Sequence, residues 1–153
     1  MKSIFLLLAL FVFFSARCQV SDSLGKMEGQ RSFNEAFFEK ITGKVLPDFT
    51  AKDLNGMIYT GSAVRNGKVT FLNFWFAACT PCIAEIPNLN LLYDMLKDNP
   101  DVQFFAITWD PETQTKETIK KYDIHFPVLL ISNSEASQVT FGRGYPTNMV
   151  LDK

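Results

Sequence analysis

Two cysteines separated by two residues are the clearest chemical feature of this sequence. Cys79 and Cys82 lie in the segment Cys-Thr-Pro-Cys, directly after an apolar run and at the start of a helical pattern. A sulfur atom at a helix N-terminus lies among unpaired backbone N–H groups and at the positive end of the helix dipole, which favours the thiolate. We therefore expect Cys79 to attack a substrate disulfide and Cys82, one turn further on, to resolve the mixed disulfide.

The same pair could instead form a purely structural disulfide or half of a zinc site. Zinc needs four nitrogen or sulfur ligands, and the single histidine, His125, lies 43 positions after Cys82. A lone histidine at the entry to a strand is also more often structural than catalytic. Redox chemistry is thus the preferred interpretation, with no metal and no cofactor other than the Cys79–Cys82 disulfide.

The apolar patterns around the cysteines predict an α/β fold with a mostly parallel sheet, because strands and helices alternate along the chain. The expected strands are 69–76, 102–109, 126–131 and 148–151. The expected helices are one from the cysteines to about Lys97, with Pro81 in its first turn, one over 113–122 and a short one over 135–141. Before them, Asn55-Gly56 predicts a tight hairpin turn with two positive φ angles, and residues 61–68 are expected to form a loop.

The N-terminus has the pattern of a secretory signal peptide. Lys2 precedes eleven apolar residues, Ile4 to Phe14, too few for the ~20 that span a bilayer. Ala16 and Cys18 suit cleavage after residue 18, so residues 1–18 are assigned as signal peptide and the mature protein is expected to be soluble, in the periplasm or cell envelope. Two alternatives are a lipid anchor on Cys18, for which Arg17 is a poor neighbour, and an N-terminal core helix.

The chain has the composition of one globular domain. The whole chain has 153 residues, 47% of them apolar, with 15 basic and 16 acidic side chains. This balance provides no basic surface for nucleic acid or an anionic membrane. Residues 19–42 are predicted to be a leader with a short amphipathic helix, in which Ser32 and Glu35 form a capping box ahead of Phe37 and Ile41.

Residues 73–87, Asn-Phe-Trp-Phe-Ala-Ala-Cys-Thr-Pro-Cys-Ile-Ala-Glu-Ile-Pro, resemble the active-site segment of exported thioredoxin-like proteins of the TlpA/ResA type. Residues 43–49 and 53–56 are similar to the N-terminal hairpin of that family, and residues 144–147 to its cis-proline loop. The resemblance implies a thioredoxin-like domain over 43–153 with an N-terminal β-hairpin extension. Because the family continues into a further strand and a closing helix, it also implies that these C-terminal elements are missing after Lys153.

The resemblance assigns roles to individual residues. Cys79 is the nucleophile, Cys82 the resolving thiol and Glu85 the proton acceptor, since Asn73 occupies the position of the buried aspartate of cytoplasmic thioredoxins. Position supports Glu85 independently, because a residue three after Cys82 lies on the same helical face. The residues expected to bind substrate are Trp75, Thr80, Pro81, Tyr145 and Pro146, the last in a cis peptide bond.

The expected function is that of an exported thiol-disulfide oxidoreductase. Thr80 and Pro81 place no cation or histidine between the cysteines, which favours a reductant over a strong oxidant. The resemblance implies electron supply from a membrane thiol transporter and delivery to exported thiol or disulfide proteins, with apocytochrome c as one candidate. One alternative is a peroxidase of the peroxiredoxin type, which has a threonine where Phe76 stands. The other is a non-catalytic thioredoxin-fold binding module.

Overall fold

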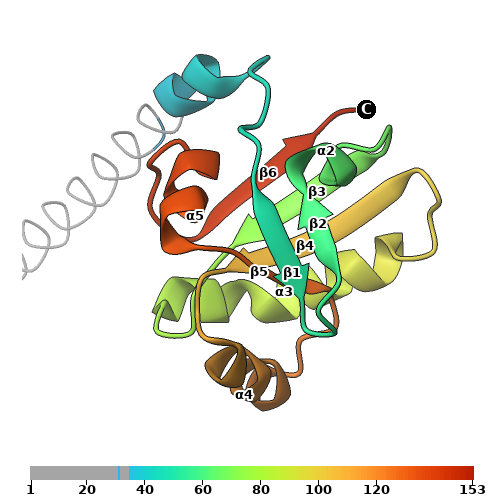
Figure 1. The fold of residues 1–153 in the computed structure, drawn as a ribbon, viewed down its shortest axis with the longest axis vertical. Coiled ribbons are helices and arrows are strands. Elements are labelled where there is room, and N and C mark those ends of the chain that lie inside the picture. Colours follow the sequence, from blue (N-terminus) through green and yellow to red (C-terminus); the bar gives the residue numbers. More distant parts are fainter. Residues whose placement is uncertain (1–30, 32–34) are drawn as a thin grey trace, which may run out of the picture. The chain divides into compact units, whose positions relative to one another are not determined.

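A computed structural model describes residue 31 and residues 35–153 (Figure 1). Residues from Leu46 to Lys153 form one compact unit, and the preceding residues belong to a separate one. The strands of the larger unit are β1 (Thr50–Asp53), β2 (Ile58–Thr60), β3 (Val69–Phe74), β4 (Val102–Thr108), β5 (Val128–Leu130) and β6 (Thr147–Leu151). The helices are α2 (Gly61–Val64), α3 (Thr80–Leu96), α4 (Glu112–Tyr122) and α5 (Asn133–Val139).

The six strands form a single mixed sheet in the order β2-β1-β5-β4-β3-β6. The pairs β3–β4 and β4–β5 are parallel, as predicted from the alternation of strands and helices. The β1–β2 hairpin joins antiparallel to β5, and β6 joins antiparallel to β3. In the described part of the chain β6 is an edge strand, and β3, which leads into the cysteines, lies between β4 and β6.

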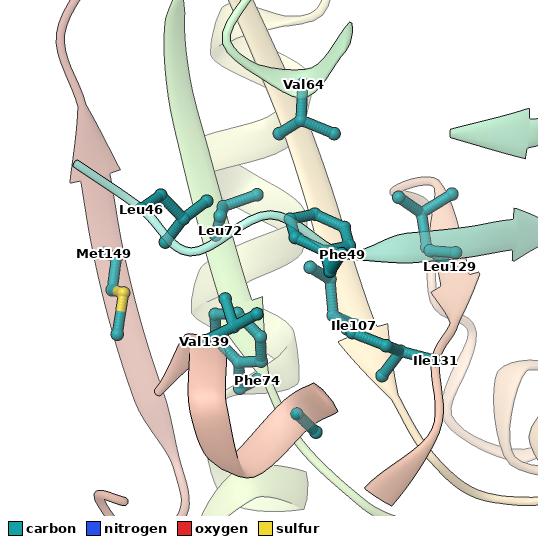
Figure 2. Packing of buried hydrophobic residues seen from close by; sticks show 12 residues of the cluster. Leu46, Phe49, Val64, Leu72, Phe74, Ile107, Leu129, Ile131, Val139 and Met149 are labelled. Atoms are coloured by element: carbon teal, nitrogen blue, oxygen red, sulfur yellow. The ribbon is translucent and has the colours of Figure 1, made fainter. Parts of the chain in front are cut away.

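Apolar side chains fill both faces of this sheet. On one face, Val64 of α2 and Val139 of α5 pack with residues of β3, β4 and β5, and Figure 2 shows Phe49 and Phe74 within this cluster. On the other face, Ile86 of α3 packs with strand residues, and Ile119 of α4 lies against them. The result is a sheet covered by α2 and α5 on one side and by α3 and α4 on the other.

The smaller unit contains a helix over residues 35–41. The helix is followed by Gly43, whose φ of +77° lies in the left-handed region, and the Thr42 amide donates to the Phe38 carbonyl at 2.8 Å. The predicted cap residue Ser32 and the predicted signal peptide lie outside the described residues. Within residues 35–153, no helix combines the length and the apolar character that a membrane crossing requires.

The hairpin forms where it was predicted, but its turn differs. Only Gly56 has a positive φ, +86°, and Asn55 does not. The Asp53 amide donates to the Met57 carbonyl at 2.9 Å and the Gly56 amide to the Asp53 carbonyl at 3.1 Å, which defines a three-residue loop with a glycine bulge. The Asp53 carboxylate also accepts the amides of Asn55 and Met57, at 2.9 and 2.8 Å, and so stabilises this longer loop.

Two other predicted boundaries are also corrected. The expected loop over 61–68 contains the single turn α2, which begins because the Thr60 hydroxyl accepts the Ala63 amide at 3.2 Å. The short helix expected over 135–141 is α5, which begins two residues earlier. Ser132 caps it by accepting the Glu135 amide at 3.2 Å, and its hydroxyl donates to the Glu135 carboxylate at 2.6 Å.

The single histidine links α3 to the segment that enters β5. Its Nδ1 lies 2.9 Å from the Asp94 carboxylate, and its Nε2 lies 3.3 Å from Asp123. These two hydrogen bonds, Asp94 first, raise the pKa of His125 above its ordinary value, and the same contact lowers the pKa of Asp94. Protonated His125 therefore favours the folded state below its unfolded pKa of about 6.5, and this contribution is lost as the pH rises through its higher folded pKa.

We expect His125→Gln to lower the melting temperature at about pH 5 and to leave it nearly unchanged at about pH 9. Thermal unfolding followed by circular dichroism at both pH values measures this. Lys116→Gln, which removes an exposed ion pair with Glu112 inside α4, is the matched control. An equal loss of stability at both pH values would show that the ring acts by packing and not by charge.

Candidate active site

The two cysteines form a disulfide at the N-terminus of α3. Cys79 is the cap residue of this helix, and Pro81 occupies its first turn, as predicted. The Sγ atom of Cys79 accepts the Cys82 amide at 3.3 Å, so a helix N–H group is directed at the first sulfur. In this oxidised state Cys79 is 5% exposed and Cys82 is 2% exposed. The intervening Thr80 and Pro81 are exposed.

Hydrogen bonds to neighbouring elements hold the loop between β3 and α3. The Trp75 amide donates to the Ile107 carbonyl at 3.1 Å, and the Cys79 amide donates to the Phe76 carbonyl at 3.0 Å. Between them, the Ala77 amide donates to the Asp110 carboxylate at 2.6 Å. Sequence reasoning missed Asp110, although it is the first charged residue after the apolar β4 segment and thus lies at the same sheet edge as the cysteines.

The predicted substrate-binding residue Trp75 lies in the core. Its side chain is 3% exposed and packs in the same cluster as both cysteines, so it cannot contact a substrate at the surface in this conformation. Its indole N–H is buried and has no hydrogen-bond partner among the described residues. In this conformation Trp75 contributes to the packing around the disulfide, and its expected role in substrate binding stays a prediction.

Three half-buried aromatic rings contact one another near the active site, and two of them, Phe76 and Tyr145, pack against the cluster that contains the disulfide. The ring centroids of Phe76 and Trp109 are 4.9 Å apart, those of Trp109 and Tyr145 are 4.4 Å apart, and those of Phe76 and Tyr145 are 5.7 Å apart. Tyr145 also packs against the cluster that contains Cys79 and Cys82. Burial raises the pKa of the Tyr145 phenol, which keeps it protonated near neutral pH. The structure thus brings the predicted residue Tyr145 to the cysteines.

The loop before β6 has the predicted cis peptide bond, between Tyr145 and Pro146. Thr147 closes this loop, since its hydroxyl donates to the Gly144 carbonyl at 2.6 Å. Tyr145 and Pro146 are both partly exposed. A residue before a proline is biased toward extended geometry, and an accessible extended backbone can pair with another extended segment.

Glu85 is half-buried on α3, three residues after Cys82. One of its carboxylate oxygens, Oε2, accepts a hydrogen bond from Asn148 Nδ2 at 3.2 Å. Asn148 belongs to β6 and was not singled out from the sequence, because only the β3–β6 register brings it near the helix. Among the described residues, no group of three or more His, Cys, Asp or Glu side chains is placed to hold a metal ion.

Comparison with known proteins identifies the family to which this chain belongs. Residues 42–153 match the model of the AhpC/TSA family. The chain belongs to this family. It is 34% identical over 112 residues to the thiol-disulfide oxidoreductase ResA of Bacillus cereus, covering 72% of this chain and 64% of that protein. It is 30% identical over 129 residues to ResA of Geobacillus kaustophilus, covering 82% of this chain and 73% of that protein.

A solved structure agrees with these relatives. The solution structure of a thiol:disulfide interchange protein from Bacteroides sp. superimposes with a TM-score of 0.64 at 27% identity, covering 72% of this chain and 74% of that one. The expected resemblance to ResA-type proteins and the thioredoxin-like fold are therefore confirmed. The chain spans 64% of the length of the Bacillus relative.

Proposed function

We propose that this protein is an exported thiol-disulfide oxidoreductase that reduces disulfide bonds in other exported proteins. The observation that carries the proposal is the Cys79–Cys82 disulfide at the N-terminus of α3, packed in one cluster with Tyr145 of the cis-proline loop. A dithiol at a helix N-terminus beside a partly exposed cis-proline loop has the parts that disulfide exchange with a peptide requires. The ResA names of the relatives support the same chemistry.

The reaction is a two-electron exchange. In the reduced protein, the Cys79 thiolate attacks one sulfur of the substrate disulfide, forms a mixed disulfide and releases the first substrate thiolate. Cys82 then gives up its proton, with Glu85 as the proposed acceptor, and attacks Cys79 Sγ. The mixed disulfide breaks and the second substrate thiolate leaves and takes up a proton. The substrate gains two electrons, and the protein returns to its Cys79–Cys82 disulfide.

The surroundings of Cys79 support a reductant. Thr80 and Pro81 carry no charge, and the Asp110 carboxylate is bonded to the Ala77 amide, two residues before Cys79. A nearby negative charge disfavours a thiolate, and a less stabilised thiolate makes the dithiol the better electron donor. We therefore propose a reduction potential nearer to that of thioredoxin, about −270 mV, than to that of DsbA, about −120 mV.

The proposed location and partners rest on the sequence. Residues 1–18 have the pattern of a cleaved secretory signal, which would place the domain outside the cytosol, where protein disulfides form. A reductant there needs its own supply of electrons. We propose a membrane thiol transporter as the donor and exported thiol proteins, including apocytochrome c, as acceptors.

The experiment is reduction of insulin disulfides by the purified protein with dithiothreitol as electron source. We expect the protein to accelerate the precipitation of insulin. Equilibration of the Cys79–Cys82 pair with dithiothreitol should give a strongly reducing reduction potential. Hydrogen peroxide as the oxidant is the matched control. Fast peroxide consumption without insulin reduction would replace the proposal with peroxidase activity, and neither reaction would indicate a non-catalytic binding module.

A further inference from the structure

Three polar side chains from three different elements form a continuous chain beside the active-site helix. Asn73 of β3 donates through Nδ2 to Asn148 Oδ1 at 2.8 Å. Asn148 of β6 donates through its own Nδ2 to Glu85 Oε2 of α3 at 3.2 Å. Asn73 and Asn148 are direct cross-strand partners in the β3–β6 register, so the backbone pairing places the two amides together.

The two hydrogen bonds run in one direction, from the buried Asn73 to the Glu85 carboxylate. Asn73 is 2% exposed and Asn148 is exposed, so Asn73 is the fixed member of the pair. An asparagine amide has one acceptor oxygen and one donor nitrogen. Because the Asn148 oxygen is taken by the Asn73 donor, its NH₂ group is directed at the carboxylate of Glu85. The chain therefore delivers a donor, and not an acceptor, to this carboxylate.

This arrangement restricts a side chain that would otherwise be free to rotate. Glu85 has three rotatable side-chain bonds and is half-buried, so the helix alone does not determine where its carboxylate lies. The hydrogen bond from Asn148 holds Oε2 on the β6 side of α3. Because the bond is made by Oε2, we expect the other oxygen, Oε1, to be the atom that takes a proton.

We propose that Asn148 is a positioning residue that holds the Glu85 carboxylate for proton transfer from Cys82. This inference rests on the proposed function. Asn148 does not contact the reacting sulfurs in our assignment, and it acts only through Glu85. Asn73, which cannot accept a proton as an aspartate would, anchors this positioning residue from the core.

The test follows release of thionitrobenzoate from Ellman's disulfide by the reduced full-length protein in a Cys18→Ser background. Attack by Cys79 releases one thionitrobenzoate, and attack by Cys82 on the resulting mixed disulfide releases the second. The second phase thus reports the step that needs the proton acceptor. The variants are Asn148→Ala, Glu85→Gln and the double variant. Val150→Ala, at an exposed site on the same strand, is the matched control.

We expect Asn148→Ala to slow the second phase by about three- to tenfold, since it removes one hydrogen bond to a partly exposed charged group. The first phase should not change. The double variant should be no slower than Glu85→Gln, because Asn148 has no effect on the rate once the Glu85 carboxylate has been removed. Asn148→Asp, which keeps the size of the side chain but removes the donor, should also slow the second phase, whereas Val150→Ala should not.

An unchanged second phase in both Asn148 variants would overturn the proposal. So would an additional slowing by Asn148→Ala in the Glu85→Gln background, since that would show an effect that does not pass through Glu85. A wild-type protein that releases no second thionitrobenzoate would instead contradict the proposed function. The two failures are therefore distinguishable in one assay.

Discussion

Replacement of Cys79 by serine is expected to reduce insulin reduction to the level measured without protein, whereas replacement of Cys82 should trap the protein as a mixed disulfide with its substrate. The reason is the geometry at the start of α3. Cys79 Sγ is the cap of the helix and accepts the Cys82 amide at 3.3 Å, so the helix N-terminus favours a thiolate at this position. Cys82 is 2% exposed and can reach Cys79 more readily than it can reach a substrate.

Two measurements examine this prediction. Alkylation of the reduced protein near neutral pH, followed by peptide mass spectrometry, should label Cys79 before Cys82. Gel analysis without reductant should show substrate-linked species for Cys82→Ser and none for Cys79→Ser. In full-length protein that still carries residues 1–18, the matched control is Cys18→Ser, which removes the cysteine outside the site and should leave both results unchanged. Substrate trapping by Cys79→Ser, together with faster labelling of Cys82, would exchange the two roles.

The sheet and its long helices could be predicted because their signals are local. The apolar run that forms β3 and the apolar spacing of α3 are readable from neighbouring residues alone. The hairpin turn could not be predicted in the same way. Asn55-Gly56 suits a two-residue turn, but the Asp53 carboxylate accepts hydrogen bonds from two amides of a longer loop. Local preference was overridden there by a side chain outside the dipeptide.

The short helices α2 and α5 also show where prediction from local sequence fails. The turn α2 has no helical period, and its formation depends on the Thr60 cap and on burial of Val64, which is 0% exposed. By contrast, the start of α5 could have been predicted, since Ser132 and Glu135 have the spacing of a capping box. Here the signal was present in the sequence and the boundary was misplaced.

The residues of the site also differ in whether the sequence could predict them. The positions of Cys79 and Cys82 at the start of α3 follow from motif and spacing, and the cis bond before Pro146 follows from the family resemblance, whereas Asn148 depends on a pairing of residues 75 positions apart. No local pattern indicates that β6 lies beside β3 with Asn148 opposite Asn73. Long-range register of this kind becomes readable only once the sheet order is known.

Glu85→Gln is expected to slow disulfide exchange by roughly 10²-fold near neutral pH, the lower end of what a positioned general base contributes. The carboxylate lies three residues after Cys82 on α3, and Asn148 holds it at 3.2 Å. Glutamine keeps the size and the hydrogen-bonding capacity of the side chain but cannot accept the proton of Cys82. Alkylation of Cys79 should therefore remain at the wild-type rate, and thermal unfolding should change little.

The decisive measurement is the pH dependence of the resolving step. With Glu85 present, the step should be fast already near neutral pH, because the proposed acceptor is held in place by Asn148. In Glu85→Gln, the rate should rise with hydroxide concentration and approach the wild-type rate only in alkaline solution, since water or hydroxide must remove the proton. Glu117→Gln, a substitution in α4 on the exterior of the protein, is the matched control. Equal rates for Glu85→Gln and wild type from about pH 5 to 9 would show that Cys82 loses its proton directly to solvent and that Glu85 is only a helix residue.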